Sequence, residues 1–458
     1  MSSTIEVDLY EVATRPRKRK KEVAGKLTLA QPKSADDIST ILTDQKKYPS
    51  PLRPMGSGSS VTRCAQTATG TLLDMSLLDR VLSVDSDSVT VQAGIRLRDL
   101  AAYLAEENME LACGCADPNR TVGGAISSGT LGSGMPGDVS QLASSVCQIT
   151  LINGLGRNVE ITEKLPDLLV VARMSYGLLG IVYSAKLRIR KVRSYTVRTN
   201  KFDFEDFGRI IPTLMEVQGA VRASLMPFRD RVYVELRYPD ELERKTSALP
   251  WKLRDWATNT VLPTVVRSVN KMVPVKNIRD PIIDGFTEAT HVLFNSRLAT
   301  SGSNATEQTG RFKRLTVDPA AVNCTWFFPV TKFQEVLTAY KKFCEGHYRN
   351  MGFRCDLPTE LWRVDKDQYS LLSPSFNEAV FALHLRSAGK DGWDNYLLEF
   401  AEFAAHFQGG LTFNLTKGYK PGYAAKVFGR RFQRFRDLRE RLDPKDRLLN
   451  QFFAEHLR

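Results

Sequence analysis

The first part of the chain alternates short periodic segments with loops of small residues. Residues 34–42 have helical spacing, with Ser34 as a fair N-cap and Asp37 three residues on, where a capping box prefers Glu or Gln. The other elements predicted here are two strands and an amphipathic helix, at residues 72–75, 89–93 and 97–106. Small-residue loops separate these elements at residues 54–60 and 121–134.

Beyond the second loop the pattern favours strands. They are predicted at residues 146–152, 159–162 and 184–190, the last with strong alternation, and Asn153-Gly154 predicts a turn after the first. Helices do not alternate strictly with strands, as they would in a doubly wound sheet. The fold class is therefore expected to be α+β.

From about residue 194 the character of the chain changes. Strands are predicted at residues 232–237, 325–329 and 378–386, and helices at residues 333–348, 395–406 and 425–442. Residues 251–275 carry an apolar stripe flanked by Lys and Arg. The sequence contains no internal repeat.

Composition supports a folded globular protein. The chain has 458 residues, of which 42% are hydrophobic and 25% charged, and this length suggests two or three domains. No stretch approaches the roughly 20 apolar residues that a membrane-spanning helix needs. Residues 1–21 have no apolar core and instead carry a basic run at 15–21, which gives no support to secretion.

The net charge of +13 invites a nucleic-acid partner or an anionic membrane surface. No zinc, helix-turn-helix or aromatic RNA motif supports the nucleic-acid alternative. The seven cysteines are odd in number and widely spread, so reduced cytosolic thiols are expected rather than a disulfide framework. Cys113-Gly-Cys115 has no second pair at zinc spacing, so no metal site is predicted.

The two Gly/Ser tracts, about 60 residues apart, are the most informative feature. Glycines allow close approach of the backbone to a ligand, and consecutive N–H groups form anion-binding concavities. Neither tract is a Rossmann fingerprint or a P-loop. Together they suit a diphosphate, although such loops are often only loops.

In combination, Arg53-Pro-Met-Gly-Ser-Gly-Ser-Ser60, Thr121-Val-Gly-Gly-Ala125 and Ser128-Gly-Thr-Leu-Gly-Ser-Gly134 resemble the two FAD loops of the vanillyl-alcohol-oxidase flavoprotein superfamily. The sugar and aldonolactone oxidase branch, which includes D-arabinono-1,4-lactone oxidase, is the most similar. Residues 176–182 resemble the adenine-side strand, and residues 437–450 resemble the C-terminal signature of that branch. The resemblance covers residues 28–195 well and 360–458 in patches.

The resemblance implies a PCMH-type FAD domain of two α+β subdomains and a cap domain with an antiparallel sheet. The implied division is a basic flexible tail at 1–26, an FAD domain at 27–195, a substrate domain at 196–405, and a C-terminal segment at 406–458 that returns to the FAD domain. The implied cofactor-binding residues are Arg53, Pro54, Met55, Gly56, Ser57, Gly58, Ser59, Ser60, Asp117, Thr121, Val122, Gly123, Gly124, Ser127, Ser128, Thr130, Leu131, Gly134, Ile181, Val182, Asn414 and Lys417.

Three positions depart from the pattern of the family. Ser59 stands where many members attach FAD through His, so FAD is expected to be non-covalent. Leu131 stands where a His is usual in the second loop. Asn414-Leu-Thr-Lys417 replaces His-Trp-Gly-Lys, which makes the chain similar to the decaprenylphosphoryl-ribose oxidases.

Four side chains are candidates for catalysis. Lys417, carried over from the resemblance, would stabilise the reduced flavin or orient the substrate, although a surface lysine is the alternative. Glu360 and Arg363 resemble a polyol-binding Glu-x-Arg pair, but their spacing is one residue too long and a surface ion pair is equally plausible. His384, on a predicted strand, is a candidate base, while a core histidine is the commoner case.

The expected function is FAD-dependent oxidation of a hydroxyl on a sugar, aldonolactone or polyol-like substrate, with hydride transfer to flavin N5 and O2 or another electron acceptor. The alternative is an enzyme acting on a lipid-linked sugar. The expected location is the cytoplasm. Residues 251–276 suggest either peripheral contact with a membrane or a helix packed on the cap domain.

Overall fold

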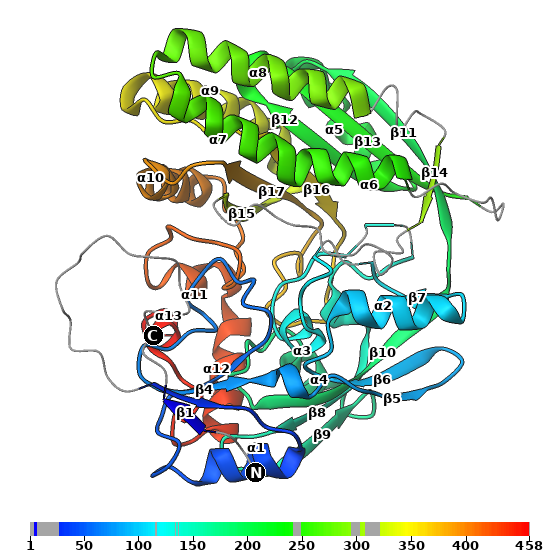
Figure 1. The fold of residues 1–458 in the computed structure, drawn as a ribbon, viewed down its shortest axis with the longest axis vertical. Coiled ribbons are helices and arrows are strands. Elements are labelled where there is room, and N and C mark those ends of the chain that lie inside the picture. Colours follow the sequence, from blue (N-terminus) through cyan, green and yellow to red (C-terminus); the bar gives the residue numbers. More distant parts are fainter. Residues whose placement is uncertain are drawn as a thin grey trace.

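The computed structural model describes residues 4–6, 27–114, 117–132, 134–135, 137–240, 249–294, 303–306 and 321–457. Figure 1 shows two halves: the lower one contains the blue and cyan segments and the red C-terminal helices, and the upper one contains most green and yellow segments and the orange helix α10. The basic run at 15–21 and Cys115 lie outside the described residues. The two-part α+β fold with an antiparallel cap sheet confirms the predicted fold class.

A small sheet opens the lower half, with the strand order β1-β2-β4-β3. Its strands are β1 (Thr4–Glu6), β2 (Leu27–Ala30), β3 (Leu52–Met55) and β4 (Gly70–Asp74), with β2 and β3 parallel to β4. Helix α1 (Ala35–Thr43) packs on this sheet through Ile38, Ile41 and Leu42. Ser34 caps α1 by accepting a hydrogen bond from the Asp37 N–H at 3.1 Å, so this predicted cap is confirmed.

The second sheet of the lower half is antiparallel. Its strands are β5 (Val81–Val84), β6 (Ser88–Gln92), β7 (Met109–Leu111), β8 (Val146–Ile152), β9 (Asn158–Thr162) and β10 (Ile181–Lys191). The helices α2 (Leu97–Glu106), α3 (Val122–Ile126) and α4 (Pro166–Ala172) accompany them. The first Gly/Ser tract follows β3 of the small sheet, and the second surrounds α3, so the tracts come from different subdomains.

The upper half is built on a seven-stranded antiparallel cap sheet. Its strands, in spatial order, are β14 (Ser303–Thr306), β11 (Ser194–Phe202), β13 (Arg231–Asp240), β12 (Ala220–Met226), β16 (Thr359–Val364), β17 (Val380–Ser387) and β15 (Val322–Pro329). One face packs on α5 (Phe204–Glu216), α9 (Phe333–Met351) and α10 (Trp393–His406) through a large core that is rich in aromatic residues.

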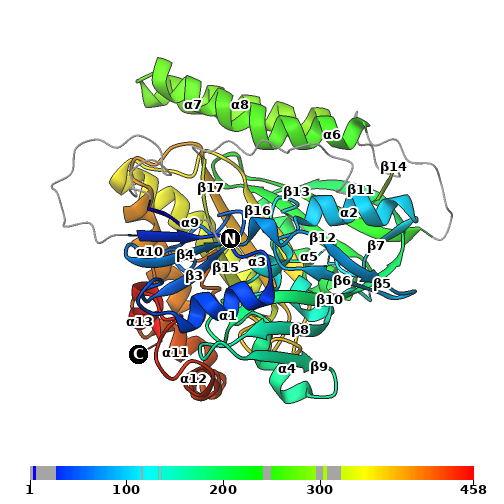
Figure 2. The same cartoon turned by 60° about the horizontal axis from the view of Figure 1, so that its bottom comes forward.

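The opposite face of the cap sheet is covered by a separate layer of helices, seen at one edge of the molecule in Figure 2. This layer consists of α6 (Leu249–Trp256), a π-helical turn (Ala257–Val261), α7 (Leu262–Met272) and α8 (Lys276–Leu293). Leu262 and Val266 pack inward with Ile283 of α8. The apolar stripe predicted at 251–275 therefore faces mainly the cap domain.

The last helices return to the lower half. They are α11 (Tyr423–Phe428), α12 (Arg430–Leu442) and α13 (Gln451–His456). Between α12 and α13, the buried Arg447 donates to the carbonyl oxygens of Ile41, Leu42 and Tyr48. Residues 447 and 448 are thus part of the core of the small sheet, whereas Phe432, Phe435 and Phe453 pack into the core of the second sheet.

Candidate functional site: a pocket between two glycine loops and a polar chamber above it

The two Gly/Ser tracts meet in one pocket, whose non-atom space of about 770 Å³ includes open solvent. The predicted residues that line it are Arg53, Pro54, Met55, Gly56, Ser57, Gly58, Ser59, Ser60, Thr121, Gly123, Gly124, Ser127, Ser128 and Val182. Lining residues that the sequence did not indicate are Cys64, Ala65, Met75, Ala93, Arg120, Tyr176 and Gly177.

The backbones of the two tracts approach each other closely. A Cβ on Gly56 would lie 2.2 Å from Oγ1 of Thr121, and a Cβ on Gly123 would lie 2.8 Å from Cβ of Ala93. Gly58 has φ +71°, which side chains other than glycine rarely adopt. A pocket walled by such bare backbone and serine hydroxyls fits a dinucleotide diphosphate, because N–H and O–H donors can hold it without cations.

Arg53 lines this pocket but its guanidinium is committed elsewhere. It is 2% exposed and donates to the carbonyl oxygens of Leu448 at 2.8 Å, Cys64 at 2.9 Å and Tyr176 at 2.6 Å. Burial lowers the pKa of Arg53 to about 10. The side chain therefore joins three segments around the first tract, and its contacts are with protein carbonyls.

Arg120 plays the corresponding part for the second tract. Its guanidinium donates to the Gly129 carbonyl at 3.0 Å and to the hydroxyls of Ser128 and Thr130. Five N–H donors in a planar fork suit such a multiple contact. Arg120 holds the 124–130 backbone in its curved form, a role that no spacing in the sequence reveals.

Other predicted cofactor residues are not among those that line the described pocket. Asn414 exchanges two hydrogen bonds with the Gly129 backbone, accepting at 3.1 Å and donating at 2.9 Å. Asp117 accepts from the Asn119 N–H, and Leu131 packs against Phe327 of β15. The remaining residues of this group are Val122, Thr130, Gly134, Ile181 and Lys417.

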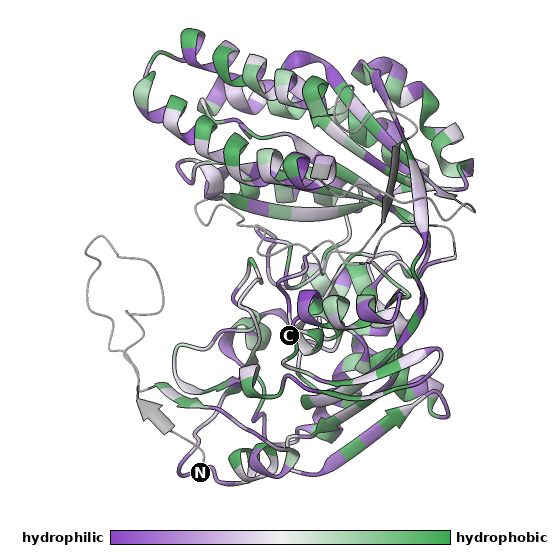
Figure 3. Ribbon diagram, turned by 45° about the vertical axis from the view of Figure 1, so that its right-hand side comes forward, coloured by the Kyte–Doolittle hydropathy of each residue, from purple (hydrophilic) through white to green (hydrophobic). Residues whose placement is uncertain are grey.

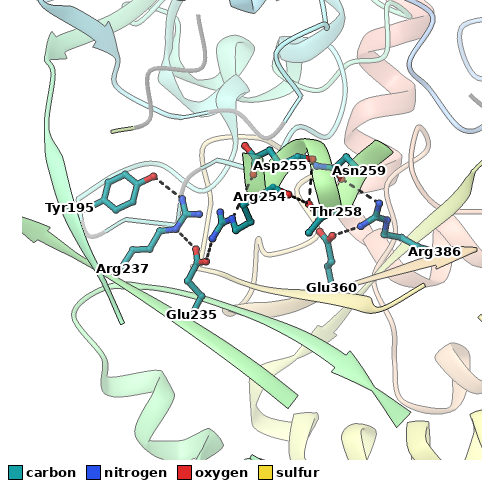
Figure 4. A network of polar contacts seen from close by, with 9 residues as sticks. All are labelled: Tyr195, Glu235, Arg237, Arg254, Asp255, Thr258, Asn259, Glu360 and Arg386. Carbon is teal, nitrogen blue, oxygen red and sulfur yellow. Dashed lines mark hydrogen bonds and ion pairs between the residues drawn. The ribbon is translucent and has the colours of Figure 1, made fainter. Parts of the chain in front are cut away.

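A second polar site lies on the cap sheet, on the face covered by α6. Glu360 and Trp362 of β16 share this face with His384 and Arg386 of β17, and Glu360 is directly opposite His384 in the ladder. The Arg386 guanidinium contacts the Glu360 carboxylate at 2.5 Å (Figure 4). Both candidate residues Glu360 and His384 are therefore brought together, with Arg386 as a partner that the sequence did not indicate.

Glu360, Trp362, His384 and Arg386 form a polar cluster beneath α6, named the chamber here, in which the Glu360 side chain is partly accessible to solvent. That side chain is 30% exposed, yet burial is the largest influence on its pKa. Burial would raise this pKa, but the charge of Arg386 and its hydrogen bond to the carboxylate oppose burial, and the pKa lies below its usual range. The carboxylate is therefore ionised and reachable by a small polar molecule.

His384 is neutral in the same chamber. Burial lowers its pKa to about 4, although the Glu360 charge opposes the shift. Nδ1 lies 2.8 Å from Oγ1 of Thr325, and the ring is tilted against Trp362 with 5.2 Å between centroids. When Nδ1 donates to Thr325, Nε2 carries the free lone pair and can accept a proton.

Helix α6 and the π-helical turn cover this chamber through charged contacts (Figure 4). Arg254 contacts Glu235 of β13 at 2.5 Å, and Asn259 accepts from Arg386 at 3.3 Å. Burial opposes ionisation of Glu235, but Arg237 and Arg254 hold its pKa well below the usual range. The roof of the chamber is thus fixed to the cap sheet by ion pairs.

Arg363 lies on the other face of β16. Its guanidinium donates to the carbonyl oxygens of Leu214, Val217 and Gly219. The structure does not bring it together with Glu360, which agrees with the irregular spacing of this pair. Its contacts fix the end of α5.

The chamber and the pocket are joined by residues 412–417. Asn414 contacts the second tract, while the Thr325 N–H donates to Leu415 and the Thr416 hydroxyl donates to the Thr325 carbonyl. Thr325 is also the partner of His384. Half-buried Lys417 follows, held through its N–H to Sγ of Cys324 at 3.3 Å, and its ammonium has no ion pair within the described residues.

Comparisons with known proteins agree with this geometry. Residues 27–162 match the model of a family described as FAD binding domain. L-gulonolactone oxidase of Mus musculus is 26% identical, over 93% of this chain and 94% of that protein. L-gulono-1,4-lactone dehydrogenase of Mycobacterium tuberculosis is 30% identical over 36% of this chain and 38% of its own. The crystal structure of cholesterol oxidase from Brevibacterium sterolicum shares the fold, with a TM-score of 0.73 at 13% identity, over 94% of both chains.

The fold and the pocket define an FAD-dependent oxidoreductase that acts on CH–OH groups. More particularly, the chain is similar over most of its length to enzymes of the sugar and aldonolactone oxidase branch, and this supports the resemblance that the two tracts indicated. Within the described residues there is no cluster of metal-ligating side chains and no helix long and apolar enough to cross a membrane. The six described cysteines are free thiols.

We expect the cofactor to be released by acid. No histidine is among the residues that line the described pocket, and Ser59 offers only a hydroxyl, which contacts that of Ser57 at 3.1 Å. The measurement is flavin absorbance after precipitation of the holoprotein with trichloroacetic acid and centrifugation. Yellow colour in the supernatant is expected, and colour retained in the washed pellet would contradict non-covalent binding.

Proposed function

We propose that the protein oxidises a hydroxyl group of a sugar, aldonolactone or polyol-like substrate held in the chamber, and passes electrons to O2 or another acceptor. The chamber carries this proposal: an ionised carboxylate, a neutral imidazole and a guanidinium lie together, and residues 412–417 contact both Thr325 beside them and the second tract of the cofactor pocket. The lactone oxidase and lactone dehydrogenases among the relatives support the substrate class.

The bound flavin would supply the acceptor for the hydride. Residues of the chain would bind and orient the substrate and accept its hydroxyl proton. Nε2 of His384 accepts the hydroxyl proton, because a neutral imidazole is a competent base at pH 7. Glu360, fixed by Arg386, accepts hydrogen bonds from neighbouring hydroxyls, and Trp362 offers a ring face to the apolar side of a sugar. Lys417 remains a candidate for stabilising negative charge.

Arg363 takes no part in this proposal, since its donors are used by backbone carbonyls.

We also propose the division into an FAD domain at 27–195, a substrate domain at 196–405 and a returning segment at 406–458. The β10–β11 connection at residues 192–193 supports the first boundary. A lipid-linked sugar is the second candidate substrate, supported by the Asn414–Lys417 sequence and by a surface of the helical layer that is described below.

The substrate class is tested by anaerobic bleaching of the bound flavin. Aldonolactones, polyols and sugars are mixed with the holoprotein and the absorbance near 450 nm is followed. We expect bleaching by at least one compound that carries adjacent hydroxyls, since Glu360 and His384 face each other across two strands. If dithionite bleaches the flavin while no member of the three classes does so, the proposed substrate class is wrong.

A further inference from the structure

Helix α8 of the helical layer is amphipathic in the reverse of the usual sense. Its buried residues are polar except for Ile283, namely Asp280, Thr287 and His291, whereas most of its large apolar side chains face solvent. The outward set is Val275, just before the helix, with Ile278, Ile282, Phe286 and Leu293, which are between 37% and 57% exposed. These positions share one helical face. A surface helix normally buries such a stripe.

The inward face of α8 is held by ion pairs. Asp284 contacts Arg354 at 2.8 Å, and Glu288 contacts Arg229 at 2.6 Å and Lys201 at 3.2 Å. His291 stacks on Tyr233, with 5.2 Å between centroids and an interplanar angle of 14°. These contacts fix the orientation of the helix. Because the polar side chains are paired with residues of the cap domain, the apolar stripe is turned outward.

Exposed apolar side chains are concentrated in this layer. Among the described residues, seventeen large hydrophobic side chains are exposed, and nine of them belong to residues 249–294: Leu253, Trp256, Met272, Val275, Ile278, Ile282, Phe286, Val292 and Leu293. Hydrophobic residues recur along these helices in Figure 3. Contiguous apolar surface of this kind marks an interaction site.

The charges of the helical layer indicate which kind of partner its outer surface would bind. Each of its acidic residues, Asp255, Asp280, Asp284 and Glu288, lies within salt-bridge distance of an arginine. The exposed charged side chains of the layer are Lys252, Lys271 and Lys276. The outer surface is therefore apolar and cationic. A second copy of the same surface would bring cations against cations, whereas anionic lipid headgroups complement them.

We propose that the outer surface of α8, with Met272 and the lysines beside it, is a docking surface for an anionic lipid bilayer. The apolar stripe enters the boundary between headgroups and acyl chains, and the lysines contact the headgroups. The chamber lies on the inner side of the same helical layer, since Arg254 and Asn259 of that layer contact its walls. The docking proposal does not rest on oxidation of a sugar, aldonolactone or polyol, although a bilayer at this surface would favour a lipid-linked substrate.

The test is co-sedimentation of the FAD-loaded protein with vesicles of phosphatidylcholine alone or with about 30% phosphatidylserine. The wild type is expected to pellet with the anionic vesicles. Ile278→Ser/Ile282→Ser/Phe286→Ser should weaken binding about tenfold for each side chain. The matched control is Leu165→Ser/Leu398→Ser, which alters side chains that are 49% and 58% exposed elsewhere, and it should bind like the wild type.

Lys271→Glu/Lys276→Glu provides a second variant that leaves the apolar stripe unchanged. It should lower binding to anionic vesicles about 30-fold or more, with little effect on neutral ones. Equal recovery of the wild type in the supernatant with and without phosphatidylserine overturns the proposal. So does light scattering that shows a wild-type dimer, a monomeric serine variant and no vesicle binding, which would assign the surface to a second copy. Flavin content and thermal unfolding verify that each variant is folded.

Discussion

Replacing His384 by Gln is expected to lower kcat/KM by about 100- to 10,000-fold, the usual contribution of a positioned general base. Gln retains a hydrogen bond to Thr325, whose hydroxyl lies 2.8 Å from Nδ1, but it cannot accept the substrate proton. The flavin pocket is not lined by this residue, so FAD content should not change. Steady-state kinetics and the rate of anaerobic flavin reduction measure the effect.

The pH dependence separates this role from a structural one. Burial lowers the pKa of His384 to about 4, so the imidazole is unprotonated above that pH and kcat/KM should fall only as the pH drops through about 4. An ordinary histidine would place this decline near pH 6.5. The variant should lose the acidic decline together with the rate.

The control for this variant is His406→Gln, which changes an exposed histidine at the end of α10. It should leave both the rate and the pH profile unchanged. A His384→Gln enzyme that keeps more than about a third of the wild-type kcat/KM, with the same acidic decline, would show that the proton goes to another group.

The second large effect is expected at Gly56. In Gly56→Ala, the new methyl group would lie 2.2 Å from Oγ1 of Thr121, so the two tracts must move apart. Rotation of the Thr121 side chain would relieve this overlap only by breaking the cap of α3, in which Oγ1 accepts from the Gly124 N–H. Loss of such a cap costs about 1 kcal/mol. We expect FAD affinity to fall at least about 100-fold, or roughly 3 kcal/mol. Fluorescence titration of the apoprotein with FAD measures it.

Two further variants make this test specific. Gly346→Ala adds a methyl group in α9 with nothing within 4 Å and should bind FAD like the wild type. Gly56→Ala/Thr121→Ala removes the obstructing hydroxyl and should regain part of the lost affinity. Unchanged FAD binding by Gly56→Ala would mean that the contact between the two tracts does not shape the pocket.

The pocket was predictable because its chemistry is local in the sequence. Runs of small residues at 56–60 and 121–128 by themselves indicate a backbone that a ligand can approach closely, without knowledge of distant contacts. Most of these residues line the pocket. The same cannot be said of the arginines. Arg53 satisfies a carbonyl 395 residues away, and Arg120 sits among turn residues with no periodic pattern, so neither role follows from spacing.

Only part of the chamber was predictable from the sequence. Glu360 and His384 were singled out by residue type, but their partner Arg386 comes from strand pairing, which one sequence does not give. Glu360 and Arg363 were paired by residue type although their spacing is one residue too long, and alternation along β16 places the two side chains on different faces of the sheet. Helix α8 was not predicted from the sequence. Most of its large apolar residues face solvent and most of its buried residues are polar, so its pattern differs from that of a helix packed on a core.

The return of the C-terminal segment to the first subdomain has a consequence for biosynthesis. Arg53 needs the Leu448 carbonyl, and Asn450 donates to the carbonyls of Cys64 and Gln66 beside the first tract. The FAD loop therefore cannot close until the ribosome has released nearly the whole described chain. A nascent protein whose cofactor site is completed last stays exposed to chaperones and proteases for most of its translation.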